Sequence, residues 1–430
     1  MKESEESEEI KEFYCLVSFP YPSGKGLHLG HVYNYAIMDS YCRWKRKKGY
    51  DVFQPFGYDS YGLPAENYAR KHNRDPREVT YENIDNFRKQ MDNMNTQYEE
   101  KLITSDDSYS KWTQWIFTKL YERGLAYKKV SPVNYCNSCE TVIANSQVED
   151  GKCERCSTIV EMKELDQWFF KISEYKNRLI KNLDWIDYPE STKKQQRHWM
   201  EDMQDWCVSR QRKWGCPIPI EGEEDTLDTF VDSSFYWLRY LDPDNKEELF
   251  DKSKYKQPDL YVGGPEHSCM HLIYSRFIHM FLYDIGIVPT EEPFKRLIHN
   301  GMITLDGNKM SKSKGNTVSP DNYDPDILRF FLMFIGHYFD GGNWDDSNIK
   351  GVRRFISRFS RWISLSSKDG ESIDTDKLSE TIDNYTESFK FNKVVSSFME
   401  FYNKNKNKVI SIESGEEIKK IIKCFIPGFK

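Results

Sequence analysis

One short segment limits the fold of this chain more than any other. An apolar run, Tyr14–Val17, passes directly into S-F-P-Y-P-S-G-K-G-L-H-L-G-H at residues 18–31. The run predicts a strand, the prolines and glycines end it, and a helix is expected from about His31 to Lys48. Asp51–Pro55 predicts a second short strand. A strand–helix–strand unit implies a parallel sheet with helices on its faces, so we expect an α/β fold.

The rest of the chain extends this unit. Residues 77–125 have large apolar and aromatic side chains at helical spacing and are predicted to be helical. Strand and helix alternation resumes at about residue 205. Leu260–Gly264 predicts a strand that ends in a glycine turn, and a helix from about His267 to Ile285 follows it. Beyond Trp344 the pattern is helical and rich in lysine.

Length and charge restrict the class of protein. A chain of 430 residues is too long for one simple core and predicts two or three domains. The net charge of -7 means that the chain has no overall excess of positive charge for binding nucleic acid. A basic site for such a partner would have to be local. The run Arg43–Lys48 is one candidate, and a solvated helix face is the other interpretation.

Targeting signals and cysteine usage both indicate a cytoplasmic protein that contacts no membrane. Residues 1–9 are acidic and lack the apolar stretch of a signal peptide. No segment reaches the roughly eighteen consecutive apolar residues of a membrane span. Six cysteines are scattered singly, unlike a secreted disulfide framework.

The segment around His28 and His31 has the features of a phosphate site. A strand that ends in a glycine-rich turn before a helix presents free backbone N–H groups and the positive end of the helix dipole. The two histidines fall on one side of the first helical turn, where they can donate to phosphate oxygens. A metal site is the competing interpretation, but a third ligand is missing. Two ordinary surface histidines are another.

A second segment, Lys309–Ser313, reads K-M-S-K-S in a glycine-bounded loop. Its two ammonium groups can clamp a transferring pyrophosphate, although a lone K-x-x-K is common on protein surfaces. H-L-G-H followed by K-M-S-K-S, in that order, resembles the two signatures of class I aminoacyl-tRNA synthetases.

Four further cysteines form two C-x-x-C pairs, Cys136 with Cys139 and Cys153 with Cys156. This spacing predicts a tetrahedral structural Zn²⁺ site, and four sulfur ligands leave no open position for catalysis. A redox pair is the alternative.

Several other segments make the chain similar to the leucyl-tRNA synthetase family of the bacterial type, from Phe13 to about Ser360. The segments are F-P-Y-P-S-G at 19–24, G-L-P-A-E-N at 62–67, V-S-R-Q-R at 208–212, D-T-F at 228–230, G-G-P-E-H at 263–267 and N-W at 343–344. The resemblance implies a Rossmann-like parallel-sheet catalytic domain with a small zinc-binding insertion and a truncated C-terminal helical bundle.

The resemblance also implies a role for each matching residue. Stabilisation of the ATP phosphates, with Mg²⁺ bound to ATP, is expected from His28, His31, Lys309 and Lys312. Further ATP contacts are expected from Gly30, Gly263, Gly264, Glu266, Met302 and Ile303. Asp59 would bind the α-ammonium of leucine. The leucine side chain would be surrounded by Phe19, Tyr21, Phe230, Ser233, Tyr236, Tyr261, His267 and His271.

The expected domains follow the same resemblance. They are a first catalytic half (1–130), a connecting insertion with the zinc module (131–204), a second catalytic half (205–304), the K-M-S-K-S loop with a stem-contact region (305–344) and a helical, anticodon-binding-type domain (345–430). Family members carry an editing domain in the insertion, but Met200 and Trp206 lie too close together to hold one. The usual C-terminal part of the family also has no counterpart, which leaves room for a second chain supplying those tRNA-binding elements.

We therefore expect a compact leucine–tRNA ligase that forms leucyl-adenylate from L-leucine and ATP and charges tRNA(Leu) without post-transfer editing. Two alternatives stay open. One is an adenylating enzyme that uses a non-tRNA acceptor, and the other is a non-catalytic leucine sensor or RNA-binding derivative.

Overall fold

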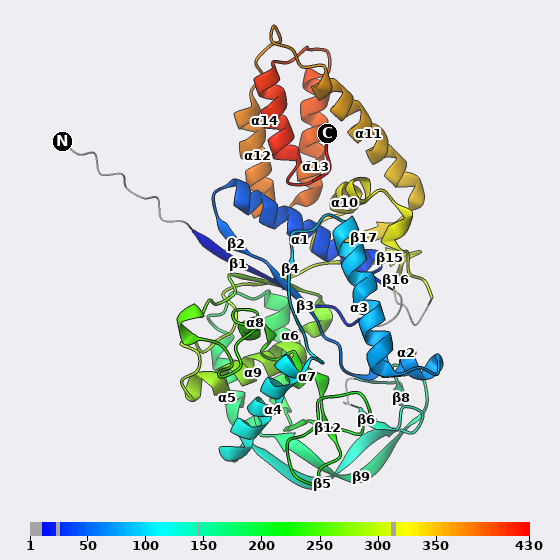
Figure 1. Cartoon of the computed structure of the whole chain (residues 1–430), viewed down its shortest axis with the longest axis vertical. Coiled ribbons are helices and arrows are strands. Elements are labelled where there is room, and N and C mark those ends of the chain that lie inside the picture. The colour runs from blue at the N-terminus through cyan, green and yellow to red at the C-terminus, as the bar shows by residue number, and fades with distance from the viewer. Residues whose placement is uncertain (1–10, 23–25, 144–146, 311–314) are drawn as a thin grey trace, which may run out of the picture.

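The computed structural model describes residues 11–22, 26–143, 147–310 and 315–430. Figure 1 shows three regions along the long axis of the molecule, with helices of the C-terminal part at one end, a parallel sheet in the middle and a long antiparallel hairpin at the other end. Among the described residues, no helix combines the length and the apolar character needed to cross a bilayer.

The central sheet is parallel, as the sequence predicts. Its strand order is β14–β13–β1–β2, and neighbouring strands are hydrogen-bonded. β1 (Glu12–Val17) lies between β2 (Asp51–Phe53) and β13 (Leu260–Gly263), and β14 (Leu297–His299) pairs with the far side of β13. Residues 1–130 and 205–304, the two expected catalytic halves, therefore contribute strands to one sheet although they are far apart in the sequence.

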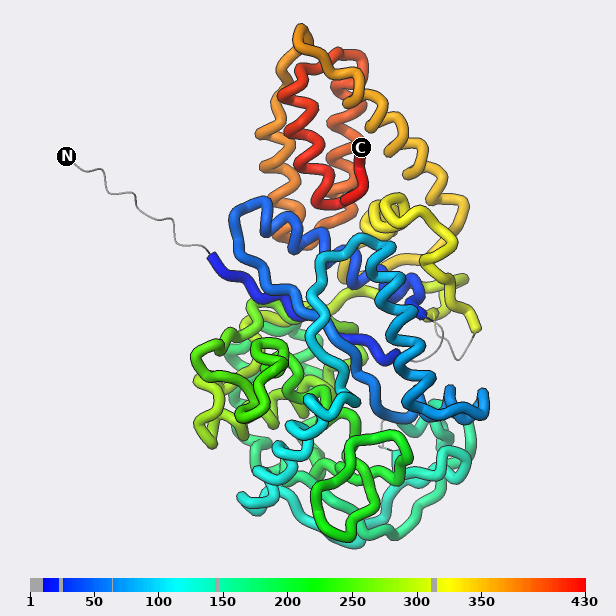
Figure 2. The backbone as a smooth tube through the Cα atoms, in the orientation of Figure 1, coloured from blue at the N-terminus to red at the C-terminus, as the bar shows by residue number. Residues whose placement is uncertain are grey.

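Helix α1 (Leu29–Lys47) follows the first strand and is buried on almost every side. Its carboxyl-terminal half lies against the C-terminal helices (Figure 2). Asp39 of α1 and Arg329 of α10 (Pro325–Phe334) form a fully buried ion pair at 2.6 Å that joins these two helices. The basic run at the end of α1 also serves the fold, because Lys45 pairs with Glu387 at 2.8 Å.

The prediction of continuous helix over residues 77–125 is wrong in its middle. The structure has α3 (Pro76–Asn93), then β4 (Glu99–Ile103), then α4 (Asp107–Glu122). Asn95 has φ of 49°, a left-handed conformation that ends the helix, and β4 pairs in parallel with β3 (Pro55–Tyr58). The strand depends on this pairing across the fold, which helical spacing does not reveal.

The connecting region is built on a long antiparallel pair, β5 (Ala126–Cys136) and β9 (Val160–Phe170), extended by β10 (Trp206–Cys207) and β6 (Thr141–Ile143). Helix α6 (Glu190–Glu201) precedes β10 by only a few residues.

The C-terminal part is helical, as predicted. It contains α11 (Asp346–Ser364), α12 (Thr375–Glu387), α13 (Phe391–Asn405) and α14 (Ile412–Ile422), and their shared core includes the fully buried Phe359. The remaining elements are α2 (Leu63–Lys71), β7 (Val148–Glu149), β8 (Lys152–Cys153), η2 (Ile172–Tyr175), α5 (Lys176–Asn182), β11 (Ser209–Arg210), β12 (Thr226–Leu227), α7 (Thr229–Asp232), α8 (Tyr236–Arg239), η3 (Lys252–Lys254), η4 (Pro265–His267), α9 (His271–Asp284), β15 (Met302–Leu305), β16 (Asn308–Lys309), η6 (Pro320–Asn322) and β17 (Gly341–Trp344).

Candidate active site

The predicted site residues follow the carboxyl ends of parallel strands. β1 leads to the turn before His28, β3 leads to Asp59, and β13 leads to Gly264. The Asp59 N–H donates to the carbonyl of Pro20 at 3.0 Å, which ties the chain after β3 to the chain after β1. In open α/β sheets this edge is where ligands bind.

The two histidines cap the helix that they begin. His28 is the N-cap of α1, and its Nδ1 accepts from the Gly30 N–H at 3.1 Å. His31 returns the interaction, since its Nδ1 accepts from the His28 N–H at 3.3 Å. With Nδ1 as the acceptor, Nε2 of each neutral ring carries the proton and has the donor character that a phosphate oxygen requires. A Cβ on Gly30 would lie 2.9 Å from the His28 ring, so the close approach needs glycine.

The second signature begins on the β15–β16 hairpin. Lys309 is exposed, and its Nζ lies 3.1 Å from Oε1 of Glu266. Although burial acts to raise the pKa of Glu266, the positive charges of His267 and Lys309 lower it. Lys312 lies outside the described residues.

The residues predicted to contact the nucleotide differ in exposure. Met302 is exposed, whereas the side chain of Ile303 lies in the core, so any contact of Ile303 with ATP would come from its backbone. The carbonyl of Gly263 accepts from Nδ1 of His299 at 2.9 Å. A Cβ on Gly264 would lie 2.2 Å from the Glu266 carboxylate, so a side chain here would displace that carboxylate.

Asp59 is a buried carboxylate without a cationic partner among the described residues. It is 2% exposed, and the Thr229 hydroxyl donates to its Oδ1 at 3.2 Å. Burial is the main cause that raises the pKa of Asp59 to about 8. By contrast, the neighbouring Asp228 is compensated, because Arg210 contacts its Oδ2 at 2.5 Å. An ammonium group placed at Asp59 would supply the missing positive charge.

A neutral hydrogen-bonded network lies deeper in the fold. His271 bridges Ser233 Oγ, at 3.1 Å from its Nδ1, and the hydroxyl of Tyr261, at 2.9 Å from its Nε2. Burial lowers the pKa of His271 to about 3, so the imidazole is uncharged at neutral pH. These three side chains were all predicted to line the leucine pocket.

Aromatic side chains surround this network. Phe19 and Tyr236 stack with ring centroids 3.9 Å apart and planes only 1° apart. His267 lies on η4, outside helix α9, but its ring is still 5.8 Å from that of His271. Phe230 and Tyr21 line an adjoining pocket together with Thr229 and Asp228. The structure thus brings the predicted residues together, and their contact with leucine stays a prediction.

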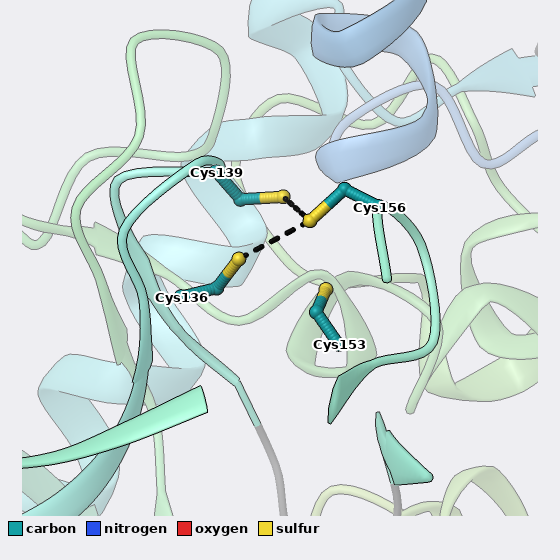
Figure 3. Close-up of side chains that lie close together, drawn as sticks. All are labelled: Cys136, Cys139, Cys153 and Cys156. Atoms are coloured by element: carbon teal, nitrogen blue, oxygen red, sulfur yellow. Dashed lines mark hydrogen bonds between the residues drawn. The ribbon is translucent and has the colours of Figure 1, made fainter. Parts of the chain in front are cut away.

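The four cysteines of the two C-x-x-C pairs converge at one point (Figure 3). Their Sγ atoms all lie within 4.8 Å of one another. A tetrahedral Zn²⁺ with Zn–S bonds of about 2.3 Å needs sulfur separations of about 3.8 Å, so this cluster fits the ion closely. The cluster packs against Leu63, the first residue of α2, and has the character of a structural site.

Sequence reasoning missed several residues that hold the site. Thr229 and Arg210 lie in quoted motifs, but their bonds to Asp59 and Asp228 join separate segments of the chain. His299 ends β14 and contacts Thr192 at 2.7 Å and Ser268 at 3.2 Å as well as Gly263. A histidine at the carboxyl end of a buried strand was the available signal for it.

Comparison with known proteins agrees with this geometry. The family model described as tRNA synthetases class I (M) matches residues 13–351. The chain therefore belongs to the class I aminoacyl-tRNA synthetases.

Within that class, the similar curated relatives are leucine–tRNA ligases. Those of Clostridium beijerinckii and Clostridium tetani are each 31% identical, and the matches cover 97% of this chain and 84% and 85% of the two relatives. A crystal structure described as the ternary complex of Agrobacterium radiobacter K84 agnB2 LeuRS, tRNA and LeuAMS has a TM-score of 0.88 and 25% identity. The match covers 98% of this chain and 84% of the chain in the crystal structure. A methionyl-tRNA synthetase of Mycobacterium tuberculosis shares the fold, with a TM-score of 0.77 and 20% identity over 97% of this chain and 92% of the other.

Proposed function

We propose that the chain activates L-leucine with ATP and transfers the leucyl group to the 3′ end of tRNA(Leu), without post-transfer editing. In the first step a carboxylate oxygen of leucine attacks the α-phosphorus of ATP. The bond from that phosphorus to the bridging oxygen breaks, and pyrophosphate leaves. In the second step a hydroxyl of the terminal ribose attacks the activated carbonyl carbon, and AMP leaves.

The observation that carries this proposal is the buried, uncompensated carboxylate of Asp59 beside a neutral pocket. Asp59 would bind an α-ammonium, while the pocket around His271 takes an uncharged side chain. A free amino acid held in this way would keep its carboxylate free to react with ATP at the helix start formed by His28 and His31. Positioning of this kind supplies much of the catalysis in a reaction that needs no nucleophilic side chain.

The phosphate side completes the mechanism. His28 and His31 at the N-terminus of α1, with Lys309 and Lys312 of the second signature, would stabilise the negative charge that grows on the departing pyrophosphate. Gly263, Gly264 and Glu266 would hold the ribose and adenine. Mg²⁺ is expected to accompany ATP, where it would offset phosphate charge.

The test is ATP–pyrophosphate exchange with each of the twenty amino acids, followed by charging of tRNA(Leu). Leucine-dependent exchange together with charging is the expected result. Exchange without charging would instead favour a non-tRNA acceptor. Leucine binding without exchange would favour a sensor or an RNA-binding derivative.

The absence of editing is supported by the join after α6. Only Asp202–Asp205 separate α6 from β10. The match to the Clostridium beijerinckii relative also runs over 684 residues, so that relative has inserted segments without a counterpart among these 430 residues. An apolar pocket alone separates substrates that differ by one methylene by about 1–3 kcal/mol. Incubation with tRNA charged with isoleucine or norvaline should give no deacylation above a no-enzyme control, and hydrolysis above that background would contradict the proposal.

The surface of α11 supports a role in binding tRNA. Its exposed cations recur at helical spacing, and no ion pair joins any of them to an acidic residue within the described part of the chain: Lys350, Arg353, Arg354, Arg358 and Arg361. A basic stripe of this kind fits the phosphate backbone of RNA.

Replacement of both Arg354 and Arg358 by alanine should weaken tRNA charging, most strongly at low salt, and should make charging less sensitive to salt, while leucine-dependent exchange stays unchanged. The exposed Lys404 on α13 gives the matched control, Lys404→Ala, which should alter neither activity. Equal charging by the double variant and wild type would exclude this surface. The domain boundaries, the cytoplasmic location and a second chain with further tRNA-binding elements stay predictions.

A further inference from the structure

The side chain of Gln90 joins the two signature segments. It lies on α3, outside both motifs, and is 6% exposed. Its Oε1 accepts from the backbone N–H of Leu27, the residue before His28, at 2.6 Å. Its Nε2 donates to Oδ2 of Asp321, in the segment that follows the second signature, at 2.7 Å. One amide therefore spans the two parts of the chain that must act on the same phosphates.

The surrounding contacts make this bridge specific. Asn83, two helical turns earlier on α3, donates to the carbonyl of Pro22 at 2.9 Å, so α3 holds the chain on both sides of the glycine turn. The Leu29 N–H donates to the carbonyl of Val318 at 3.1 Å, which brings the start of α1 directly against the segment before Asp321. A Cβ on Gly26, which has φ of 155°, would lie 2.6 Å from Oε1 of Gln90, so the amide and the turn are in close contact.

The chemistry of the bridge suits an amide. The backbone N–H of Leu27 needs an acceptor, and Oδ2 of Asp321, which also accepts from Ser319 Oγ at 3.1 Å, takes a second donor; a carboxamide supplies an acceptor and a donor from one side chain. The orientation of the amide is fixed by these two partners. A glutamate of the same length would keep the bond to Leu27 but would place a negative charge against Asp321.

We propose that Gln90 is a positioning residue for adenylation, which sets the distance between the histidine signature and the segment after the lysine signature. The inference rests on the proposed function, because it assigns Gln90 to the phosphate-stabilising step. The side chain of Gln90 is bonded to the backbone before His28 and to Asp321, and it would act on the reaction through these two partners. Its loss should therefore lower kcat of exchange and leave KM for leucine unchanged, since the ammonium site at Asp59 is not involved.

The experiment compares Gln90→Glu, Asp321→Asn and the double variant in leucine-dependent exchange. Gln90→Glu should lower kcat about tenfold or more, as expected when a buried hydrogen bond is replaced by two facing acceptors. The double variant again pairs a donor with an acceptor and should return to within about threefold of wild type. The matched control is Asn93→Asp, the same chemical change on an exposed residue of α3 that lines a surface groove together with Gln90 and Asp321, and it should leave kcat unchanged.

Hydrogen–deuterium exchange gives a second readout that does not need catalysis. Peptides over residues 26–31 and 318–322 should lose protection in Gln90→Glu, regain it in the double variant and stay unchanged in Asn93→Asp. Wild-type kcat in Gln90→Glu, or no recovery in the double variant, would overturn the proposal. A lower melting temperature with unchanged kcat would show a packing role only and would also overturn it. Wild-type protein without exchange for any amino acid would refute the proposed function, and the peptide data would still decide whether Gln90 bridges the segments.

Discussion

The two sides of the candidate site are built in opposite ways: the proposed leucine side around Asp59 and His271, and the proposed phosphate side around His28, His31 and Lys309. On the leucine side the polar groups are buried, and His271, which bridges Ser233 and Tyr261, is neutral at physiological pH. On the phosphate side the groups are less deeply buried, since His28 and His31 are half-buried and Lys309 pairs with Glu266 at the surface. One half resembles a protein core, and the other resembles a protein surface.

This difference follows from what each side has to do. An uncharged side chain such as that of leucine is recognised by shape, and shape requires side chains that are already packed. A transferring phosphate changes its charge during the reaction, so it needs donors that can come close as that charge grows. The comparison therefore predicts that changes on the leucine side alter substrate binding, whereas changes on the phosphate side alter the rate of the chemical step.

The largest expected effect comes from Asp59→Asn. Removal of the negative charge leaves a buried ammonium unpaired, so kcat/KM for leucine in exchange should fall about a thousandfold, while KM for ATP stays within about threefold. Because burial raises the pKa of Asp59 from 3.8 to about 8, its ionisation costs folding stability that is lost progressively between these pH values and is lost in full above pH 8, so the variant should melt no lower than wild type there.

Thr229→Val is the matched control for Asp59→Asn. It removes only the Thr229 hydroxyl, while Tyr21 and Thr104 still hydrogen-bond Asp59, and the loss should be about tenfold or less. If Asp59→Asn keeps kcat/KM within tenfold of wild type, the ammonium does not bind at this carboxylate and the leucine side is misassigned.

The second-largest effect is expected from a change on the phosphate side. Lys312→Ala should lower the rate of exchange about a hundredfold or more and leave leucine affinity intact, because a contact made in the transition state is lost. Affinity is measured by calorimetry and the rate by pyrophosphate exchange. Lys314→Ala, two residues further along the chain, is the control and should have a much smaller effect. An unchanged rate in Lys312→Ala would remove that lysine from the mechanism.

Parts of this site could be predicted from the sequence and parts could not. The strand, turn and helix around His28 are predicted by the prolines and glycines between them. The cysteine cluster is predicted by the spacing of its two C-x-x-C pairs. β4 could not be predicted, because Glu99–Ile103 becomes a strand only by pairing with β3. Gln90 and His299 were missed for a similar reason, since their partners lie in segments that only the fold brings together. Local signals predicted the reacting groups, whereas the groups that hold them depend on tertiary contacts.

Removal of zinc should affect the leucine side only. The cysteine cluster packs on α2, where Arg70 donates to the carbonyl of Ser138 at 2.8 Å, and α2 begins four residues after Asp59. Protein purified without chelator should hold one zinc per chain. Cys139→Ser should raise KM for leucine about tenfold through misplacement of this segment, with KM for ATP unchanged.

The control for the zinc experiment is Cys207→Ser, which changes a cysteine outside the cluster and should alter neither zinc content nor KM. Absence of zinc from the wild-type protein, or a disulfide within the cluster under reducing conditions, would contradict the structural site. Equal changes in both KM values would contradict its restriction to the leucine side.

The smallest expected effect is the release of a proton when leucine binds. Since burial raises the pKa of Asp59 to about 8, most of the carboxyl groups are protonated at pH 7, and a bound ammonium would favour the ionised form. Leucine binding should then release close to one proton per site at pH 7 and almost none near pH 9, above which the α-ammonium of free leucine itself loses its proton; the affinity should rise about tenfold per pH unit up to pH 8. His271, with a pKa of about 3, contributes nothing in this range. Titration calorimetry in buffers of different ionisation enthalpy measures the release, and Asp59→Asn should abolish it. Leucine binding at pH 7 without proton release would mean that the ammonium lies elsewhere or that Asp59 is already ionised, and either result would remove the contrast between the two sides of the site.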